Sequence, residues 1–93
     1  NPTHYAVALR YDPATSPAPI VVAKGMNLVA LRIREIAEEH GVTVITNPPL
    51  ARALFKATRV GQEIPADLYE AVAEILAFVY RLRSTRFGRR PAA

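Results

Sequence analysis

The first four residues of the chain, Asn1-Pro2-Thr3-His4, combine side chains that could cut the backbone beside them. Asparagine usually reacts when the amide nitrogen of the next residue attacks its side-chain carbonyl. Pro2 has no N–H, so this route is closed. The side-chain nitrogen of Asn1 can instead attack the Asn1 backbone carbonyl, which closes a succinimide ring and expels Pro2 as a secondary amine. The chain would then be cut between Asn1 and Pro2.

This cyclisation needs a fold that holds the Asn1 nitrogen within attacking distance and a group that helps to move its proton. His4 is the nearby side chain that titrates near neutrality, and the Thr3 hydroxyl could fix the turn. Another interpretation stays open at this point. Asn-Pro commonly initiates turns, and a histidine beside a strand is most often a surface residue. The dipeptide alone favours an ordinary turn.

Asn47-Pro48 has the same covalent potential, but a helix N-cap followed by proline in the first turn explains it fully. The two histidines, His4 and His40, are far apart in the sequence and there is no cysteine, so we expect no metal site and no cofactor. No Ser/His/Asp set, phosphate-binding glycine loop or carboxylate pair stands out. The sequence therefore does not predict a turnover enzyme.

The elements that follow the motif alternate between strand and helix patterns. Tyr5–Tyr11 alternates large and small side chains, which predicts a strand with Tyr5, Val7, Leu9 and Tyr11 on one face. Three prolines keep residues 12–19 extended, and Ile20–Ala23 reads as a short buried strand that Gly25 ends. Asn27 is a predicted N-cap for a helix that ends at His40 and Gly41. Its predicted apolar stripe is Leu28, Val29, Leu31, Ile33, Ile36 and Ala37, and Arg34 is expected to pair with Glu38.

The second half of the chain predicts one more strand and two helices. Val42–Thr46 is the strand, and residues 20–46 should form a right-handed parallel crossover. A helix over Leu50–Thr58 and a last helix after Ile64-Pro65 follow. The order β-β-α-β-α-α predicts a small α/β domain with a mixed sheet and three helices. We expect a preceding segment to supply a fourth strand upstream of Asn1.

The chain of 93 residues predicts one domain, over residues 1–83, with a basic, disordered tail over residues 84–93. The net charge of +4 is concentrated near the C-terminus, where residues 81–90 carry five arginines, whereas residues 1–80 are nearly neutral. A solvated helix end explains this tail. A contact for an acidic partner or lipid surface, or a small nucleic-acid-binding domain, stays an alternative. No apolar run is long enough to span a bilayer.

Several segments, in order and without large gaps, resemble the FlhB/YscU family of type III export switch proteins. The matching segments are Asn1–Leu9, Ala18-Pro19 with Val21–Gly25, Leu31–Ala37, Pro48–Phe55, and Val60–Pro65 followed by Leu68–Glu74. The tyrosine after His4 and the Val-Ala-Lys-Gly run are similar to the flagellar branch rather than to the virulence-injectisome branch. The resemblance covers roughly residues 1–83.

The resemblance implies a domain on the cytoplasmic face of the bacterial inner membrane, attached to transmembrane helices upstream. It implies one self-cleavage, with Asn1 as nucleophile, Pro2 as leaving group, and Thr3 and His4 shaping and assisting the turn. The cut would permit the switch from rod and hook substrates to filament substrates. The implied partners are export substrates, the hook-length control protein, other export-gate subunits and the domain's own N-terminal cleavage fragment, and not nucleic acid.

A docking site for early substrates is also implied by the resemblance, as an apolar patch. Ala18 and Pro19 lie in a loop that we expect to be exposed, and small apolar residues there could accept a partner side chain. Ala73 and Leu76 on the last helix are possible neighbours. Periodicity alone allows equally that Ala73 and Leu76 belong to the core.

Overall fold

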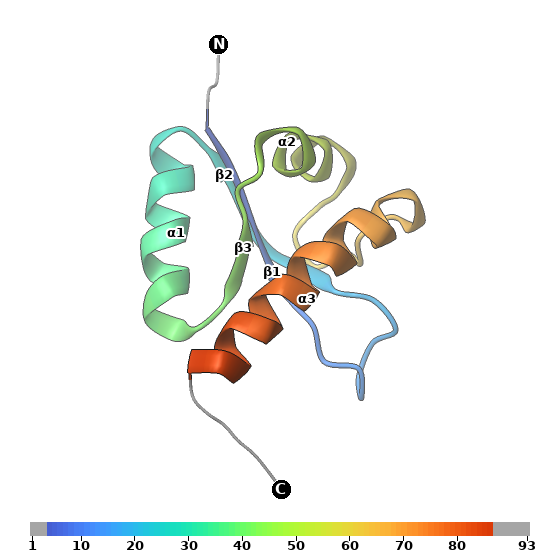
Figure 1. Cartoon of the computed structure of the whole chain (residues 1–93). Helices are drawn as coiled ribbons and strands as arrows, with labels where there is room; N and C mark the ends of the chain where they lie inside the picture. The colour runs from blue at the N-terminus through green and yellow to red at the C-terminus, as the bar shows by residue number, and fades with distance from the viewer. Residues whose placement is uncertain (1–3, 87–93) are drawn as a thin grey trace, which may run out of the picture.

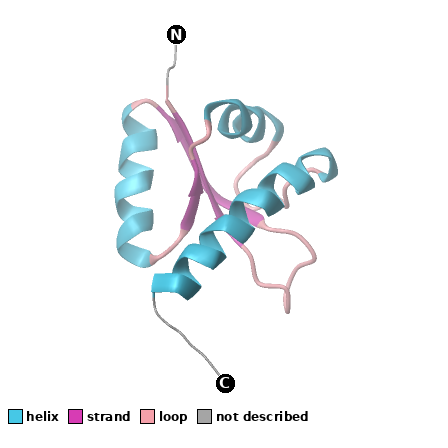
Figure 2. Cartoon of the chain, in the orientation of Figure 1, coloured by secondary structure: helices cyan, strands magenta, loops and turns pink. Residues whose placement is uncertain are grey.

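The structure is a computed structural model that describes residues 4–86, with side chains described over residues 4–77. Three strands and three α-helices alternate as predicted (Figures 1 and 2). The elements are β1 (Tyr5–Arg10), β2 (Ile20–Met26), α1 (Leu28–His40), β3 (Thr43–Ile45), α2 (Pro48–Ala57), a 3₁₀ turn (Ala66–Leu68) and α3 (Tyr69–Arg86). The predicted order β-β-α-β-α-α is therefore confirmed. Helix α3 extends three residues into the predicted tail, and residues 87–93 lie outside the described residues.

The first strand lies in the middle of the sheet, whose order is β2-β1-β3. Both neighbours run antiparallel to β1, so β2 and β3 are parallel to each other, as the predicted crossover required, but they do not touch. Both edges of β1 are occupied over Val7–Leu9. A fourth strand, predicted upstream of Asn1, would therefore have to join the sheet at β2 or β3.

Helices cover the two faces of the sheet, with α1 on one side and α2 and α3 on the other (Figure 1). This layering buries four consecutive residues of β1, from Ala6 to Leu9. A strand that is buried on both faces does not need polar side chains on one of them. Both faces of β1 can therefore carry apolar residues, the larger ones on one face and alanines on the other. The main core lies between β1, β2, α2 and α3, and consists of Val7, Leu9, Ala18, Val21, Ile45, Leu50, Ala51, Leu54, Ile64, Val72 and Leu76.

Helix α1 packs on the sheet through small residues, and the predicted apolar stripe was largely wrong. Ala30 and Ala37 are buried and Ile33 is half-buried, at spacings of three and four residues. Leu28 and Val29 are 80% and 57% exposed, and Leu31 and Ile36 are also exposed. Alanines on the buried face let α1 approach the small side chains of β1, and the larger residues are consequently left on other faces.

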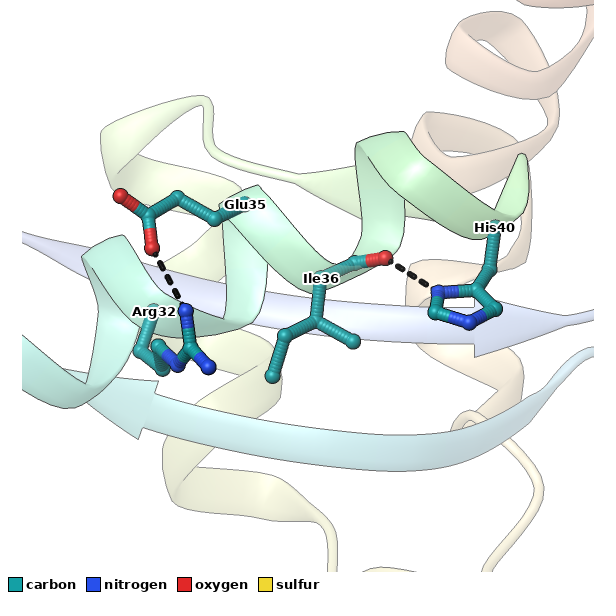
Figure 3. Close-up of polar contacts among 4 residues, drawn as sticks. All are labelled: Arg32, Glu35, Ile36 and His40. Carbon is teal, nitrogen blue, oxygen red and sulfur yellow. Dashed lines mark hydrogen bonds and ion pairs between the residues drawn. The ribbon is translucent and has the colours of Figure 1, made fainter.

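The polar side of α1 and its C-terminal end are shown in Figure 3. Arg32 pairs with Glu35 at 3.0 Å, whereas the described residues have no ion pair between Arg34 and Glu38, which the sequence predicted. The helix ends as predicted, because Gly41 adopts a left-handed conformation (φ 68°) and donates its N–H to the Ala37 carbonyl. His40 Nδ1 donates to the Ile36 carbonyl at 2.8 Å, which satisfies another carbonyl of the last turn.

Gly25 does not end β2, as the sequence predicted, but lies inside the strand opposite Ala6. Its function is to permit a close approach between β2 and α1. A Cβ at this position would lie 2.3 Å from Val29 Cγ1 and 3.1 Å from Ile33 Cδ1. The glycine therefore fixes how closely the start of α1 can pack on the sheet.

Gly25→Ala is expected to destabilise the domain by about 2 kcal/mol, because the added methyl overpacks this contact. Chemical denaturation measures the loss. Adding Val29→Ala removes the methyl groups that clash, so the double variant should recover part of the lost stability. If the stability lost in the double variant equals the sum of the losses in the two single variants, the clash with Val29 does not cause the destabilisation by Gly25→Ala.

Helix α2 begins two residues earlier than predicted. Asn47 caps it through its side chain, whose Oδ1 accepts from the Leu50 N–H at 3.2 Å, and Pro48 follows in the first turn. The capping interpretation of this Asn-Pro pair is confirmed. Leu50 and Leu54 are buried as predicted, while Phe55 is only half-buried.

Candidate functional site

The Asn1-Pro2-Thr3-His4 motif directly precedes the central strand in the sequence. Asn1, Pro2 and Thr3 are outside the described residues, so the structure leaves their predicted roles as predictions. His4 is the first described residue and is exposed, and β1 begins directly after it. The fourth to ninth residues after the Asn1-Pro2 bond therefore form β1, whose residues Ala6 to Leu9 are all buried.

Neighbouring backbone fixes the position of His4. Tyr5 pairs with Met26 at the end of β2, and the Asn27 N–H donates to the His4 carbonyl at 2.9 Å. The sheet thus restrains the downstream side of the motif up to two residues from Pro2. A restrained stem of this kind is what an intramolecular attack requires, because it limits the conformations that the reacting groups can adopt.

A hollow beside His4 contains polar side chains from two other elements. Arg34 reaches it from α1 and Thr46 from the loop after β3, and the remaining lining residues are Tyr5, Ala30, Leu31 and Pro48. Sequence reasoning missed Arg34 and Thr46, because only the crossover from β2 through α1 to β3 brings them to the end of β1. Both are polar groups that line the same hollow as His4.

A second set of contacts connects the motif's end of β1 to the C-terminal end of α2. The Tyr5 and Phe55 rings make an edge-to-face contact with centroids 5.2 Å apart, and Lys24 Nζ lies 4.8 Å from the Phe55 ring centroid. The Lys24 ammonium also donates to the carbonyls of Phe55 (2.8 Å) and Thr58. A cation is favourable at a helix C-terminus, so Lys24 stabilises the end of α2 against β2.

The four predicted docking residues line one hollow on the other side of the domain. Ala18, Pro19, Ala73 and Leu76 all contribute to it, and its other lining residues are Tyr11, Pro17, Ile64, Tyr69 and Val72. It has a volume of about 170 Å³, well below the roughly 300 Å³ of a small-molecule pocket, and is predominantly apolar. A hollow of this size and lining has room for an apolar side chain.

The exposure predicted for this site was partly wrong. Ala18 is 2% exposed and Pro19 is also buried, because their loop is held in place. Ile64 N–H donates to the Pro19 carbonyl at 3.0 Å, and the Ser16 hydroxyl contacts the Ala18 carbonyl at 2.7 Å. Leu76 belongs to the core, as the alternative interpretation had it, while Ala73 is exposed. Ala18, Pro19 and Leu76 therefore form the floor of the hollow and Ala73 part of its rim.

Sequence reasoning missed the two tyrosines at this hollow. Tyr11 and Tyr69 are 37% and 45% exposed, and they come from the end of β1 and the start of α3. Exposed aromatic residues beside an apolar hollow are typical of protein-binding surfaces. Within the described residues no group of three His, Cys, Asp or Glu side chains could hold a metal, and no described helix is long and apolar enough to cross a membrane.

Comparisons with known proteins agree with the resemblance seen in the sequence. The family model described as "FlhB HrpN YscU SpaS Family" matches residues 1–79. The flagellar biosynthetic protein FlhB of Salmonella typhimurium is 57% identical in an alignment over 93 residues that covers 98% of this chain and 24% of that protein. The chain thus spans about a quarter of the length of the curated relatives it matches.

Solved structures show the same fold. The cytoplasmic domain of FlhB from Shewanella putrefaciens is 47% identical with a TM-score of 0.83, and the match covers 97% of this chain and 71% of that chain. The PscU C-terminal domain is also 47% identical, with a TM-score of 0.76 and coverage of 84% and 99%. A family model over most of the chain, relatives of high identity and a shared fold agree, and the chain belongs to the FlhB HrpN YscU SpaS family.

Proposed function

We propose that this chain is the cytosolic domain of a flagellar type III export protein, and that it cuts itself once between Asn1 and Pro2. Family membership supports the export role, because the similar proteins are named flagellar biosynthetic protein FlhB. One observation carries the self-cleavage: the motif stands directly before the central strand, whose first residues are fixed by β2 and Asn27. The parent protein would lie in the inner membrane, with this domain on its cytoplasmic face.

The reaction conserves all atoms. Asn1 Nδ2 forms a bond to the Asn1 backbone carbon, and the bond from that carbon to the Pro2 nitrogen breaks. The proton that Nδ2 loses matches the proton that the departing Pro2 amine gains, and His4 could carry it. The products are a C-terminal succinimide, which water later opens, and a new chain that begins at Pro2. Each molecule reacts once, so the domain is not a turnover enzyme.

The cut would change the local backbone without separating the pieces. The strand after Pro2 is held on both edges and buried on both faces, so breaking one bond upstream does not remove what anchors β1. In this proposal the N-terminal fragment stays associated, and the freed turn permits the switch from rod and hook substrates to filament substrates. The hook-length control protein and other export-gate subunits would act on this state. Early substrates would dock in the hollow at Ala73.

The nucleic-acid alternative gains no support from the described residues. It depends on arginines from Arg81 to Arg90, whose side chains lie outside those that the structure describes. Binding of DNA or RNA that weakens steeply with salt would support it.

The proposed function is tested by the intact mass of the domain with its native upstream segment attached. Two fragments that meet at Asn1 and Pro2 support it, and an uncut chain after days at neutral pH contradicts it.

His4→Ala is expected to slow the cut by about tenfold without abolishing it, because the imidazole assists proton transfer but does not attack. Its side chain is exposed, so the change should leave the melting temperature unaltered. The fraction cut is followed by electrophoresis over time. Pro2→Ala should slow the cut more strongly. A His4→Ala variant that cuts at the wild-type rate would exclude an assisting role for the imidazole.

A further inference from the structure

Asn27 has an unusual backbone conformation. It is the one residue other than glycine with a positive φ among residues 4–86, with φ 57° and ψ −122°. Side chains with a Cβ rarely populate this region, which matches the first central position of a type II′ turn and favours glycine there. The sequence predicted a side-chain N-cap at this position. The Asn27 side chain makes no capping hydrogen bond to α1, so capping does not explain why the conformation is held.

Contacts on both sides of Asn27 enforce the conformation. Met26 before it is paired with Tyr5 in the sheet, and the Asn27 carbonyl accepts the N–H of Leu31 at 3.1 Å in the first turn of α1. Val29, two residues later, packs against Gly25 at the close approach between α1 and β2. The chain must therefore change from strand to helix within a single residue, and it does so at Asn27.

This conformation lets one backbone bond of Asn27 stay with the sheet while the chain turns into α1. The Asn27 N–H points to the His4 carbonyl, 2.9 Å away, and so extends the β1–β2 pairing by one hydrogen bond beyond Tyr5 and Met26. His4 is two residues from Pro2 in the sequence. Of the hydrogen bonds that join β1 to β2 and Asn27 among the described residues, the bond to His4 is the nearest in sequence to the Asn1-Pro2 bond.

We propose that Asn27 is a positioning residue for the self-cleavage, and that it acts through its backbone N–H. This inference rests on the proposed function. The bond to the His4 carbonyl fixes the downstream stem of the motif, which limits the positions that Pro2 and the Asn1 carbonyl carbon can take. A misplacement of about 1 Å can slow an oriented reaction by a hundredfold, so a single restraint at this distance matters for the rate.

The direct test replaces the Asn27 N–H by an ester oxygen, using the matching α-hydroxy acid in a domain that carries its native upstream segment. We expect the cut between Asn1 and Pro2 to slow by about tenfold or more. The matched control is the same replacement at Val42, which removes a hydrogen bond to the Ala37 carbonyl at the other end of the same helix. The Val42 ester should cut within about twofold of wild type, as expected of a bond that does not orient the reacting groups.

Side-chain variants provide a second test that does not depend on the ester. Asn27→Gly keeps the positive φ, whereas the β-branched side chain of Asn27→Val disfavours it. Asn27→Gly should therefore cut faster than Asn27→Val. Val72→Ala, in the core on α3, measures how far a loss of stability alone slows the cut.

Three results would overturn the positioning role alone: an Asn27 ester that cuts like wild type, equal slowing by the Val42 ester, or Asn27→Val that is no slower than an equally destabilised Val72→Ala. In each of them wild type still cuts, so the proposed function stands. A wild-type chain that does not cut contradicts the proposed function itself, and the positioning role with it.

Discussion

Replacing Asn1 by alanine is expected to abolish the cut, because the attacking nitrogen belongs to this side chain and no other group can close the same ring. In a domain with its native upstream segment, Asn1→Ala should stay a single chain under conditions in which wild type gives two fragments. Mass spectrometry distinguishes the two outcomes directly. The effect should be a complete loss rather than a slower rate, since the alanine side chain contains no nucleophile.

The chain contains a matched control in its other Asn-Pro pair. Asn47 has the same covalent potential, but its side-chain oxygen is engaged with the Leu50 N–H in the cap of α2. Asn47→Ala should therefore cut at the wild-type rate while losing about 1 kcal/mol of stability with the cap. Two results would contradict attack by an asparagine that the fold places correctly. One is an Asn1→Ala variant that is still cut before Pro2, and the other is a cut between Asn47 and Pro48.

Placing a carboxylate on the rim of the apolar hollow is expected to weaken the docking of early substrates. In the free domain Ala73 is exposed, so Ala73→Asp buries no charge until a partner covers it. In the complex the carboxylate would be desolvated without a partner, and binding should weaken by at least about tenfold, or about 1.4 kcal/mol. Titration calorimetry with a purified rod or hook subunit measures the change.

Ala71→Asp is the control for this prediction. Ala71 lies on the same helix and is also exposed, but it does not line the hollow. The two variants carry the same charge and a similar helix-propensity cost, so a difference between them reports on the hollow. Equal binding by Ala73→Asp and Ala71→Asp would mean that the substrate docks elsewhere.

The element order could be predicted from the sequence because local signals mark each element in this chain. Alternation in β1, the Asn47-Pro48 start of α2 and the Gly41 end of α1 depend on residues within one turn or strand. Each carries its own physical cause, such as a side-chain cap or a left-handed residue. These signals need no knowledge of how the elements pack.

The features that the sequence did not predict depend on packing between elements. Periodicity marked a broad apolar stripe on α1, but the face that is buried contains Ala30 and Ala37, because the small residues of β1 allow a close approach there. The sequence indicated that Gly25 ends the strand, but the glycine instead leaves room for Val29 of α1. The positive φ of Asn27 likewise follows from the need to join a paired strand to a packed helix, which no local pattern encodes.

The lining of the apolar hollow was predicted only in part for the same reason. Ala18, Pro19, Ala73 and Leu76 came from the resemblance, and the structure brings them together. Tyr11 and Tyr69 lie far apart in the sequence and meet there because α3 crosses the face of the sheet near the end of β1. The loop of Ala18 is held by a hydrogen bond from the distant Ile64 N–H to the Pro19 carbonyl. The sequence alone could therefore not distinguish this buried proline-rich loop from an exposed one.

The mass of the upstream fragment, followed over time, tests the self-cleavage most directly. Attack by the Asn1 side chain predicts a fragment that is first one water lighter than a free C-terminal acid and later gains that water, together with a partner that begins at Pro2. A chain that stays whole would contradict the account. So would an upstream fragment that carries the full acid mass from its first appearance, because water and not the side chain would then have cut the bond.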